Sequence, residues 1–214
     1  MIVEDVFLTQ DLSKLHPDNL HMFGLLVTAN KPVDHIPDPI KSGKWWILDN
    51  GAFTSKGFTE WYWLEWMEAT KDFSDTCICV VIPDVVGNCE ATIERFKTHS
   101  KVASKQFEHI AFVTQDGLTC DMTPWDDFDV LFIGGTDQHK MGREAGYLIQ
   151  EGLRRGKHIH VGRVNTEYRL MQFWQCHTWD GTALTIKPEK YESIIVNGLR
   201  AVIDKKQQPA LFSF

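Results

Sequence analysis

Acidic, amide, glycine and arginine residues follow the short apolar runs of this 214-residue sequence. The residues in these places are Asp49, Asp84, Gln115, Gly134, Gly135, Arg163 and Asp180. An aspartate after a strand is also a common turn former or helix cap, so each residue alone has a purely structural interpretation. Their recurrence at successive run ends indicates a shared site more strongly than any one of them does.

Two carboxylates at one site can divide covalent catalysis between them. One attacks as a nucleophile, and the other moves the proton of the leaving group. Retaining glycoside cleavage uses such a pair, roughly 5 Å apart, and a nucleobase is also a leaving group from a sugar. A further aspartate could accept hydrogen bonds from a guanine edge, a glutamine could donate to a carbonyl, and glycines let backbone N–H groups approach closely. The residue types therefore predict chemistry at the bond between a sugar and a base.

The apolar runs are typical of short buried strands, and helical periodicity separates them. We expect strands at Met22–Thr28, Trp45–Leu48, Cys77–Ile82, His109–Thr114, Val130–Ile133 and Ile159–Val161, with Trp179 leading into Asp180. We expect helices at Thr59–Phe73, Cys89–Ala103, Lys140–Arg155, Glu167–Gln175 and Pro188–Asp204. This alternation predicts an α/β fold of parallel units, which an open doubly wound sheet would also satisfy. Polar residues after nearly every strand favour a single, small (β/α) TIM-like barrel with its chemistry at the C-terminal rim.

Length and charge limit the organisation and the partners. A chain of 214 residues with 43% hydrophobic content fits one domain over residues 1–214. The formal net charge of −7 argues against a protein that coats nucleic acid through a general positive field. A local basic patch remains open, with Arg154, Arg155, Lys157 and Arg163 as its residues, against the alternative of a solvated helix end.

The five cysteines, Cys77, Cys79, Cys89, Cys120 and Cys176, suggest neither a disulfide framework nor a metal site. Strand alternation would place Cys77 and Cys79 on one face as buried thiols. A reducing, cytoplasmic location is expected, because the sequence begins without a signal peptide and has no window apolar enough for a membrane span.

Histidine, lysine and tryptophan side chains offer further alternatives. His158 and His160 alternate along a strand and would share a face, either as a metal pair or as polar strand positions. Lys140 could hold a phosphate beside a helix N-terminus. The dense aromatic cluster of Trp61, Tyr62, Trp63 and Trp66 is expected to serve the core or a homodimer interface, with base stacking as the alternative.

The order of the motifs DNGAF, PD, TQDG, IGG, HVGR and WDGT is similar to that of the tRNA-guanine transglycosylase superfamily. That superfamily includes phage and bacterial enzymes that insert 7-deazaguanines into DNA. The resemblance spans about residues 45 to 182. It implies a β/α barrel and base exchange through a covalent sugar–enzyme intermediate.

The resemblance also implies roles for individual residues. Asp49 resembles the general acid/base aspartate of the family's DSGGF motif, and Phe53 the aromatic residue that stacks near the base. Asp84 resembles the aspartate that recognises the guanine edge, and Gln115 the glutamine that contacts the base carbonyl. Gly134 and Gly135 resemble the turn that supplies backbone contacts, and Asp180 the nucleophile. Arg163 lies near the family's MGVG segment and is grouped with the substrate-binding residues.

Three departures from the family pattern narrow the expected substrate. The cysteine and histidine cluster of the family's zinc site is not found in this sequence, the chain is shorter than the tRNA enzymes, and Asn50 and Ala52 alter the first motif. We therefore expect DNA rather than tRNA as the nucleic acid, a purine-like base as second substrate, and neither metal nor cofactor. The alternatives are an N-glycosidase or glycosyltransferase for free nucleosides or nucleotides, and a binding module that has lost the chemistry.

Overall fold

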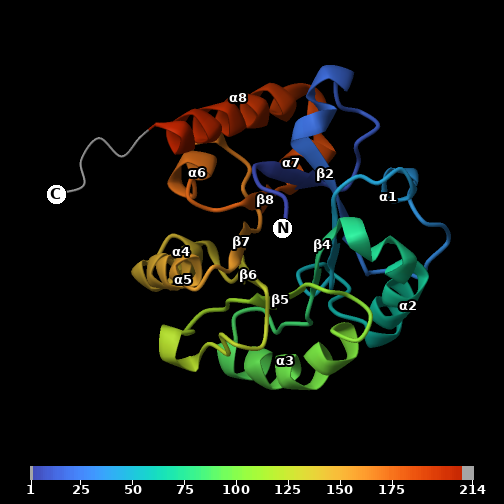
Figure 1. Ribbon diagram of the computed structural model, residues 1–214, viewed down its shortest axis with the longest axis vertical. Coiled ribbons are helices and arrows are strands. Elements are labelled where there is room, and N and C mark those ends of the chain that lie inside the picture. The colour runs from blue at the N-terminus through green and yellow to red at the C-terminus, as the bar shows by residue number, and fades with distance from the viewer. Residues whose placement is uncertain (1, 209–214) are drawn as a thin grey trace.

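Eight short parallel strands close into a barrel in the computed structural model, which describes residues 2–208. The strands follow one another around the barrel in chain order, and β1 pairs with β8 to close it. Figure 1 shows the helices arranged in a ring around the strands. The predicted TIM-like barrel is therefore confirmed, although residues 1 and 209–214 of the expected 1–214 domain lie outside the described part.

The strands are three to six residues long, and helices of very different length connect them. The strands are β1 (Val6–Thr9), β2 (Phe23–Thr28), β3 (Trp46–Asp49), β4 (Cys77–Val81), β5 (Ile110–Val113), β6 (Val130–Ile133), β7 (His158–Val161) and β8 (Thr178–Asp180). The α-helices are α1 (Asp38–Lys41), α2 (Glu60–Thr70), α3 (Cys89–Ala103), α4 (Asp137–Lys140), α5 (Arg143–Arg154), α6 (Glu167–Gln172), α7 (Thr182–Ile186) and α8 (Pro188–Gln207). Short 3-10 helices cover Pro17–Met22, Lys71–Thr76 and Cys120–Met122.

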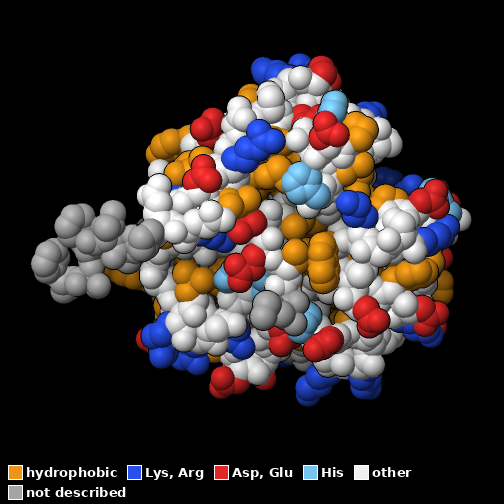
Figure 2. Space-filling view, turned by 45° about the horizontal axis from the view of Figure 1, so that its top comes forward, with side chains coloured by type: hydrophobic (Ala, Val, Ile, Leu, Met, Phe, Trp, Pro, Cys, Tyr) orange, Lys and Arg blue, Asp and Glu red, His pale blue; other side chains and the backbone are white. Residues whose placement is uncertain are grey.

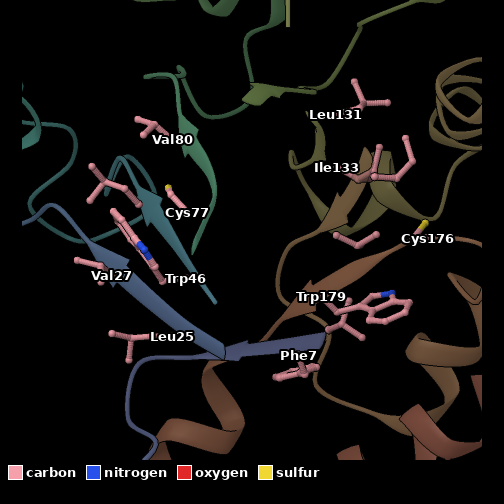
Figure 3. Packing of buried hydrophobic residues seen from close by; sticks show 14 of the residues in the cluster. Phe7, Leu25, Val27, Trp46, Cys77, Val80, Leu131, Ile133, Cys176 and Trp179 are labelled. Atoms are coloured by element: carbon pink, nitrogen blue, oxygen red, sulfur yellow. The ribbon is translucent and has the colours of Figure 1, made fainter. Parts of the chain in front are cut away.

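Residues of most strands alternate between an outer apolar layer and the barrel interior. The larger layer lies between the strands and the helices, and Figure 3 shows its labelled side chains pointing away from the centre of the barrel. The smaller layer fills the barrel interior with Val6, Leu8, Ile47, Ile78, Cys79, Val81, Ala111, Val113 and Val130. A barrel wall buried on both faces explains why the strands have near-continuous apolar sequences.

The expectation that Cys77 and Cys79 share one strand face is wrong. The adjacent residues Trp46 and Ile47 of β3 pair with Cys77 and Cys79, so Ile78 is an extra residue in β4. Such a bulge reverses the side-chain alternation from that point on. Cys77 consequently packs in the outer layer and Cys79 in the barrel interior. Burial raises the pKa of both thiols, which keeps them protonated.

The predicted strands are found within one residue of their expected bounds, whereas only the helix at Cys89–Ala103 has its expected bounds. The helix expected over Glu167–Gln175 ends at Gln172, and the helix expected over Pro188–Asp204 continues to Gln207. The segment expected as one helix over Lys140–Arg155 is split between α4 and α5, because Gly142 precedes α5 as an extended N-cap. The helix expected over Thr59–Phe73 ends at Thr70 and continues as the 3-10 helix Lys71–Thr76. No helix of residues 2–208 combines the length and the apolar character needed to cross a membrane.

The aromatic cluster of α2 divides between the core and the surface. Trp63 and Trp66 are buried, and their indole N–H groups donate to the carbonyls of Val81 and Lys31 at 3.2 and 3.0 Å. Trp61 is 71% exposed on the outside of the helix. The core interpretation is therefore confirmed for two of the four rings. Tyr62 is half-buried, and a homodimer interface at Trp61 stays a prediction.

Candidate active site

A pocket of about 320 Å³ opens at the C-terminal end of the barrel. Because all strands are parallel, the residues that follow them meet at this end. The pocket is lined by all eight residues singled out from the sequence, Asp49, Phe53, Asp84, Gln115, Gly134, Gly135, Arg163 and Asp180. Apolar side chains, among them Leu26, Val81, Val113 and Phe132, form its floor and walls. Their predicted convergence is confirmed, while their chemical roles stay predictions.

Asp180 is the last residue of β8 and is buried at the bottom of this pocket. Its Oδ2 atom lies 2.9 Å from Nε2 of His160, and its Oδ1 atom accepts the backbone N–H of Arg163 at 3.0 Å. Both carboxylate oxygens thus have a directed donor, which fixes the plane of the group. An ionised, oriented carboxylate is the form that can act as a nucleophile.

Asp49 ends β3 and has a different environment. Its Oδ2 atom accepts a long hydrogen bond of 3.3 Å from the backbone N–H of Gly51. Burial, followed by the negative charges of Asp180 and Asp84, raises the pKa of Asp49 from 3.8 to about 7. At neutral pH this carboxyl is therefore divided between its protonated and ionised forms. That condition suits a group that first gives and then takes a proton.

Asp84 is held by two amide side chains. Nδ2 of Asn50 donates to one carboxylate oxygen at 2.8 Å, and Nε2 of Gln115 donates to the other at 2.6 Å. The Gln115 carbonyl in turn accepts the backbone N–H of Gly87, and the Arg95 guanidinium donates to the Asp84 backbone carbonyl. Burial raises the pKa of Asp84, although the two amides oppose this shift. The network fixes the orientation of a carboxylate that lines the pocket.

The two glycines, expected to let backbone N–H groups approach a ligand, are packed closely against other residues of the protein. The N–H of Gly134 donates to the Thr114 hydroxyl at 3.2 Å, and a Cβ atom there would lie 2.6 Å from the Val113 side chain. Gly134 therefore permits close packing of β6 against β5. Gly135 has a φ of 72°, in the left-handed region that favours glycine, and a Cβ atom there would lie 2.8 Å from the His139 ring. The close approaches are made by the protein's own groups.

Arg163 and Phe53 form the mouth of the pocket. The guanidinium carbon lies 3.9 Å from the centre of the Phe53 ring, a cation–π contact, and the guanidinium also donates to the Gly135 carbonyl. Phe53 is nevertheless 60% exposed. An exposed aromatic ring beside an arginine plane offers a flat ligand such as a base a surface to stack on.

The local basic patch suggested by the sequence does not form. Lys157 directly precedes β7 and Arg163 follows it, so the strand places them at opposite ends of the barrel. Arg154 and Arg155 pair with Glu151 on the outside of α5. Only Arg163 reaches the pocket.

Lys140 is not available to hold a phosphate either. Its ammonium group is buried and donates to the Gly162 carbonyl at 2.8 Å. Burial, together with the Arg163 charge, lowers its pKa to about 8. Lys140 instead ties α4 to the end of β7 and places a positive charge near Asp180.

Sequence reasoning did not single out two residues that the pocket network depends on. In the sequence Asn50 is only a departure from a motif, yet its side chain donates to Asp84 and orients it. The sequence leaves His160, with His158, as one of a metal pair or as a polar strand position, yet its Nε2 atom lies 2.9 Å from Oδ2 of Asp180. Strand alternation predicts that His158 and His160 share one face, and the missing signal is the register of β7 against β8.

No family model matches this sequence, and no curated protein does. Among solved structures, the tryptophan synthase subunit alpha from Legionella pneumophila str. Paris is similar with a TM-score of 0.43 and 12% identity. The match covers 84% of this chain and 91% of that chain. At this identity the likeness concerns the fold alone.

Replacing Asp49 by asparagine is expected to stabilise the protein above neutral pH. Between pH 4 and 7 the native state keeps a proton on Asp49 that the unfolded chain has released, because its pKa is raised to about 7. Stability from this group is full at low pH and is lost as the pH rises through that value. Since Asp49 is only half-buried, we expect a gain of about 1 kcal/mol for Asp49→Asn at pH 8 and little change at pH 4.

Urea unfolding of both proteins at pH 4 and pH 8 measures this effect, and Asp137→Asn provides a control of opposite sign. Hydrogen bonding to Arg169 lowers the pKa of the exposed Asp137, so that variant should lose a little stability at high pH. A gain for Asp49→Asn that is the same at both pH values would contradict the raised pKa.

Proposed function

We propose that this protein is a transglycosylase that exchanges guanine in nucleic acid, DNA rather than tRNA, for a 7-deazaguanine. The observation that supports this most is the pair of carboxylates in one pocket with opposite environments. Asp180 has two directed donors, whereas the pKa of Asp49 is raised to about 7. Pairs of acids whose environments differ in this way divide nucleophilic and proton-transfer roles in known catalysis. The choice of guanine in nucleic acid as substrate rests on the order of the motifs from DNGAF to WDGT, which resembles that of the tRNA-guanine transglycosylase superfamily.

The proposed reaction has two balanced halves. In the first, an oxygen of Asp180 forms a bond to the anomeric carbon while the bond from that carbon to guanine breaks, and guanine leaves with a proton from Asp49. In the second, Asp49 takes a proton from the incoming base, whose nitrogen attacks the same carbon, and the Asp180 carboxylate departs. Asp49 returns to its protonated form and Asp180 to its ionised form. A pKa of about 7 serves both directions of proton transfer at neutral pH.

The base would be held opposite these carboxylates. The ionised Asp84 can accept hydrogen bonds from the N–H groups of a guanine edge, and the second N–H of the Gln115 amide can donate to a base carbonyl. The Gly135 turn lines the same side, and Phe53 with Arg163 offers a stacking surface. A base within a duplex must first be flipped out of the stack, at a cost of a few kcal/mol.

Free nucleosides or nucleotides are the second candidate substrate, favoured by the charge distribution. The net charge is −7, and Figure 2 shows acidic and basic side chains interspersed over one face of the molecule. Arg163 is the only cationic side chain among the pocket-lining residues. Tight binding of a polymer commonly uses several lysine or arginine contacts to phosphates. This candidate keeps the same two carboxylates and the same covalent step.

Isotope exchange tests the proposal directly. The protein is incubated with labelled guanine or a 7-deazaguanine and, separately, with duplex DNA, single-stranded DNA, tRNA, deoxyguanosine and guanosine monophosphate. The products are digested to nucleosides and analysed by mass spectrometry. Incorporation into DNA that falls steeply with salt is the expected result, because polymer binding releases counterions. Incorporation into free nucleosides alone, with little salt dependence, would support the second candidate, and no incorporation into any acceptor would overturn both.

A further inference from the structure

A column of polar side chains runs through the barrel interior along β7 and β8. His158, His160, Thr178 and Asp180 are each at most 7% exposed. The other strands fill the interior with apolar side chains such as Val6, Ala111 and Val130. Buried polar groups cost free energy unless their hydrogen bonds are satisfied, so each of these four side chains is expected to have a hydrogen-bond partner.

Three hydrogen bonds connect the column from end to end. The Thr178 hydroxyl lies 2.9 Å from Nε2 of His158 and 2.9 Å from Nδ1 of His160. Nε2 of His160 then lies 2.9 Å from Oδ2 of Asp180. The register of the two strands produces this arrangement, since His160 and Thr178 are direct partners in the β7–β8 pairing. Asp180 is therefore linked through three side chains to the opposite end of the barrel.

The chemistry of these groups restricts where the hydrogens lie. The nucleophile of the proposed function is an ionised carboxylate, which only accepts, so Nε2 of His160 carries a hydrogen and donates to Asp180. Burial lowers the pKa of His158 to about 2, so that ring is neutral and has one N–H. A hydroxyl has one hydrogen, which Thr178 gives either to His160 or to His158. Giving it to His158 would require hydrogens on both nitrogens of His160, which is the imidazolium cation.

The neutral form of His160 fits its surroundings better. The ring is fully buried, and the Lys140 ammonium already supplies a positive charge near Asp180. A second buried cation would have to be desolvated as well, at a large cost. The hydrogen bonds then run in one direction, from His158 to Thr178, from Thr178 to His160, and from His160 to Asp180.

We propose that His160 is a positioning residue for Asp180, held by Thr178 and His158 as the neutral tautomer with its hydrogen on Nε2. This inference rests on Asp180 being the nucleophile of the proposed function. The donor from His160 and the backbone N–H of Arg163 hold one carboxylate oxygen each, so the group meets the sugar in a fixed orientation. The same donors stabilise the carboxylate when the bond to the sugar breaks and its electron pair returns to Asp180.

Nitrogen NMR of the protein labelled with ¹⁵N-histidine reads the tautomer without reference to activity. At pH 7 we expect a protonated Nε2 and an unprotonated Nδ1 for His160, assigned by the loss of its signals in His160→Gln. Thr178→Val removes the hydroxyl that donates to Nδ1 and should shift that resonance. An imidazolium signal, or a hydrogen on Nδ1 alone, would overturn the inference whether or not the protein exchanges bases.

Two substitutions test the functional consequence in the protein that performs the exchange. His160→Leu removes the donor and should slow formation of the covalent adduct about 10²-fold, with little change in substrate KM. His160→Gln retains an N–H near the position of Nε2 and should recover most of that loss. Equal adduct rates in the wild type and His160→Leu would overturn the inference while leaving the proposed function intact. A wild type that forms no adduct would overturn the proposed function, and the NMR result would still decide the tautomer.

Discussion

Asp180→Asn is expected to abolish the covalent adduct and to reduce base exchange by on the order of 10⁴-fold. The amide of asparagine is a poor nucleophile and a worse leaving group, so both halves of the reaction lose their reacting atom. The measurement is intact-protein mass spectrometry after incubation with a guanine-containing oligonucleotide and no incoming base. Under those conditions the wild type should accumulate the aspartyl–sugar adduct.

A matched variant on the same rim separates loss of chemistry from loss of fold. Asp137→Asn changes an exposed aspartate in α4 that pairs with Arg169 and does not line the pocket. It should form the adduct at the rate of the wild type, and both variants should retain a cooperative thermal transition. Full exchange activity in folded Asp180→Asn would contradict the assignment of the nucleophile.

Trp63→Ala is expected to cost about 3 to 5 kcal/mol of unfolding free energy. The Trp63 ring is fully buried between α2 and the barrel wall, with edge contacts to Phe58 and His99. Its removal leaves a cavity and also leaves the Val81 carbonyl without the indole N–H that now donates to it. For a chain of this length such a loss lowers the Tm by roughly 10 °C or more.

Trp61 provides the control within the same helix. Trp61→Ala removes an identical side chain two residues earlier, but one that is 71% exposed. Its unfolding free energy should change by less than about 0.5 kcal/mol. Urea unfolding of both variants checks the comparison. A cost for Trp61→Ala as large as that for Trp63→Ala would show that Trp61 is covered in solution, as a homodimer interface on α2 would require.

The sequence predicted the barrel and the strand ends well because both depend on local patterns. Apolar runs bounded by polar residues identify buried strands, and parallel strands bring their C-terminal ends together. The strand β1 (Val6–Thr9) was not predicted, and β8 (Thr178–Asp180) was indicated only by Trp179 leading into Asp180. They are stabilised by pairing with each other at the closure of the barrel, a contact between residues about 170 positions apart.

The internal bonds of the site could not be predicted, because they depend on register and on local irregularity. The link from His160 to Asp180 requires β7 and β8 to align His160 with Thr178. The bulge in β4 decides which cysteine enters the barrel, and one extra residue has no signature in the alternation of CICVV. Asn50 orients Asp84 only because β3 and β4 are neighbours. Residue types indicate which chemistry a site can perform, whereas the pairing of the strands determines which side chains come into contact.

The backbone and the side chain of Arg163 serve opposite partners, and this has a consequence for substitutions at this position. Its φ of 61° is unusual for a residue with a side chain, and it directs the N–H inward to Asp180 while the guanidinium extends to Phe53. The hydrogen bond to Asp180 depends on the backbone conformation at position 163 and not on which side chain is present there. Substitutions of Arg163 can therefore change which ligands pass the pocket mouth while Asp180 keeps its backbone donor. Glycine and asparagine are the residues that this backbone conformation accepts most readily.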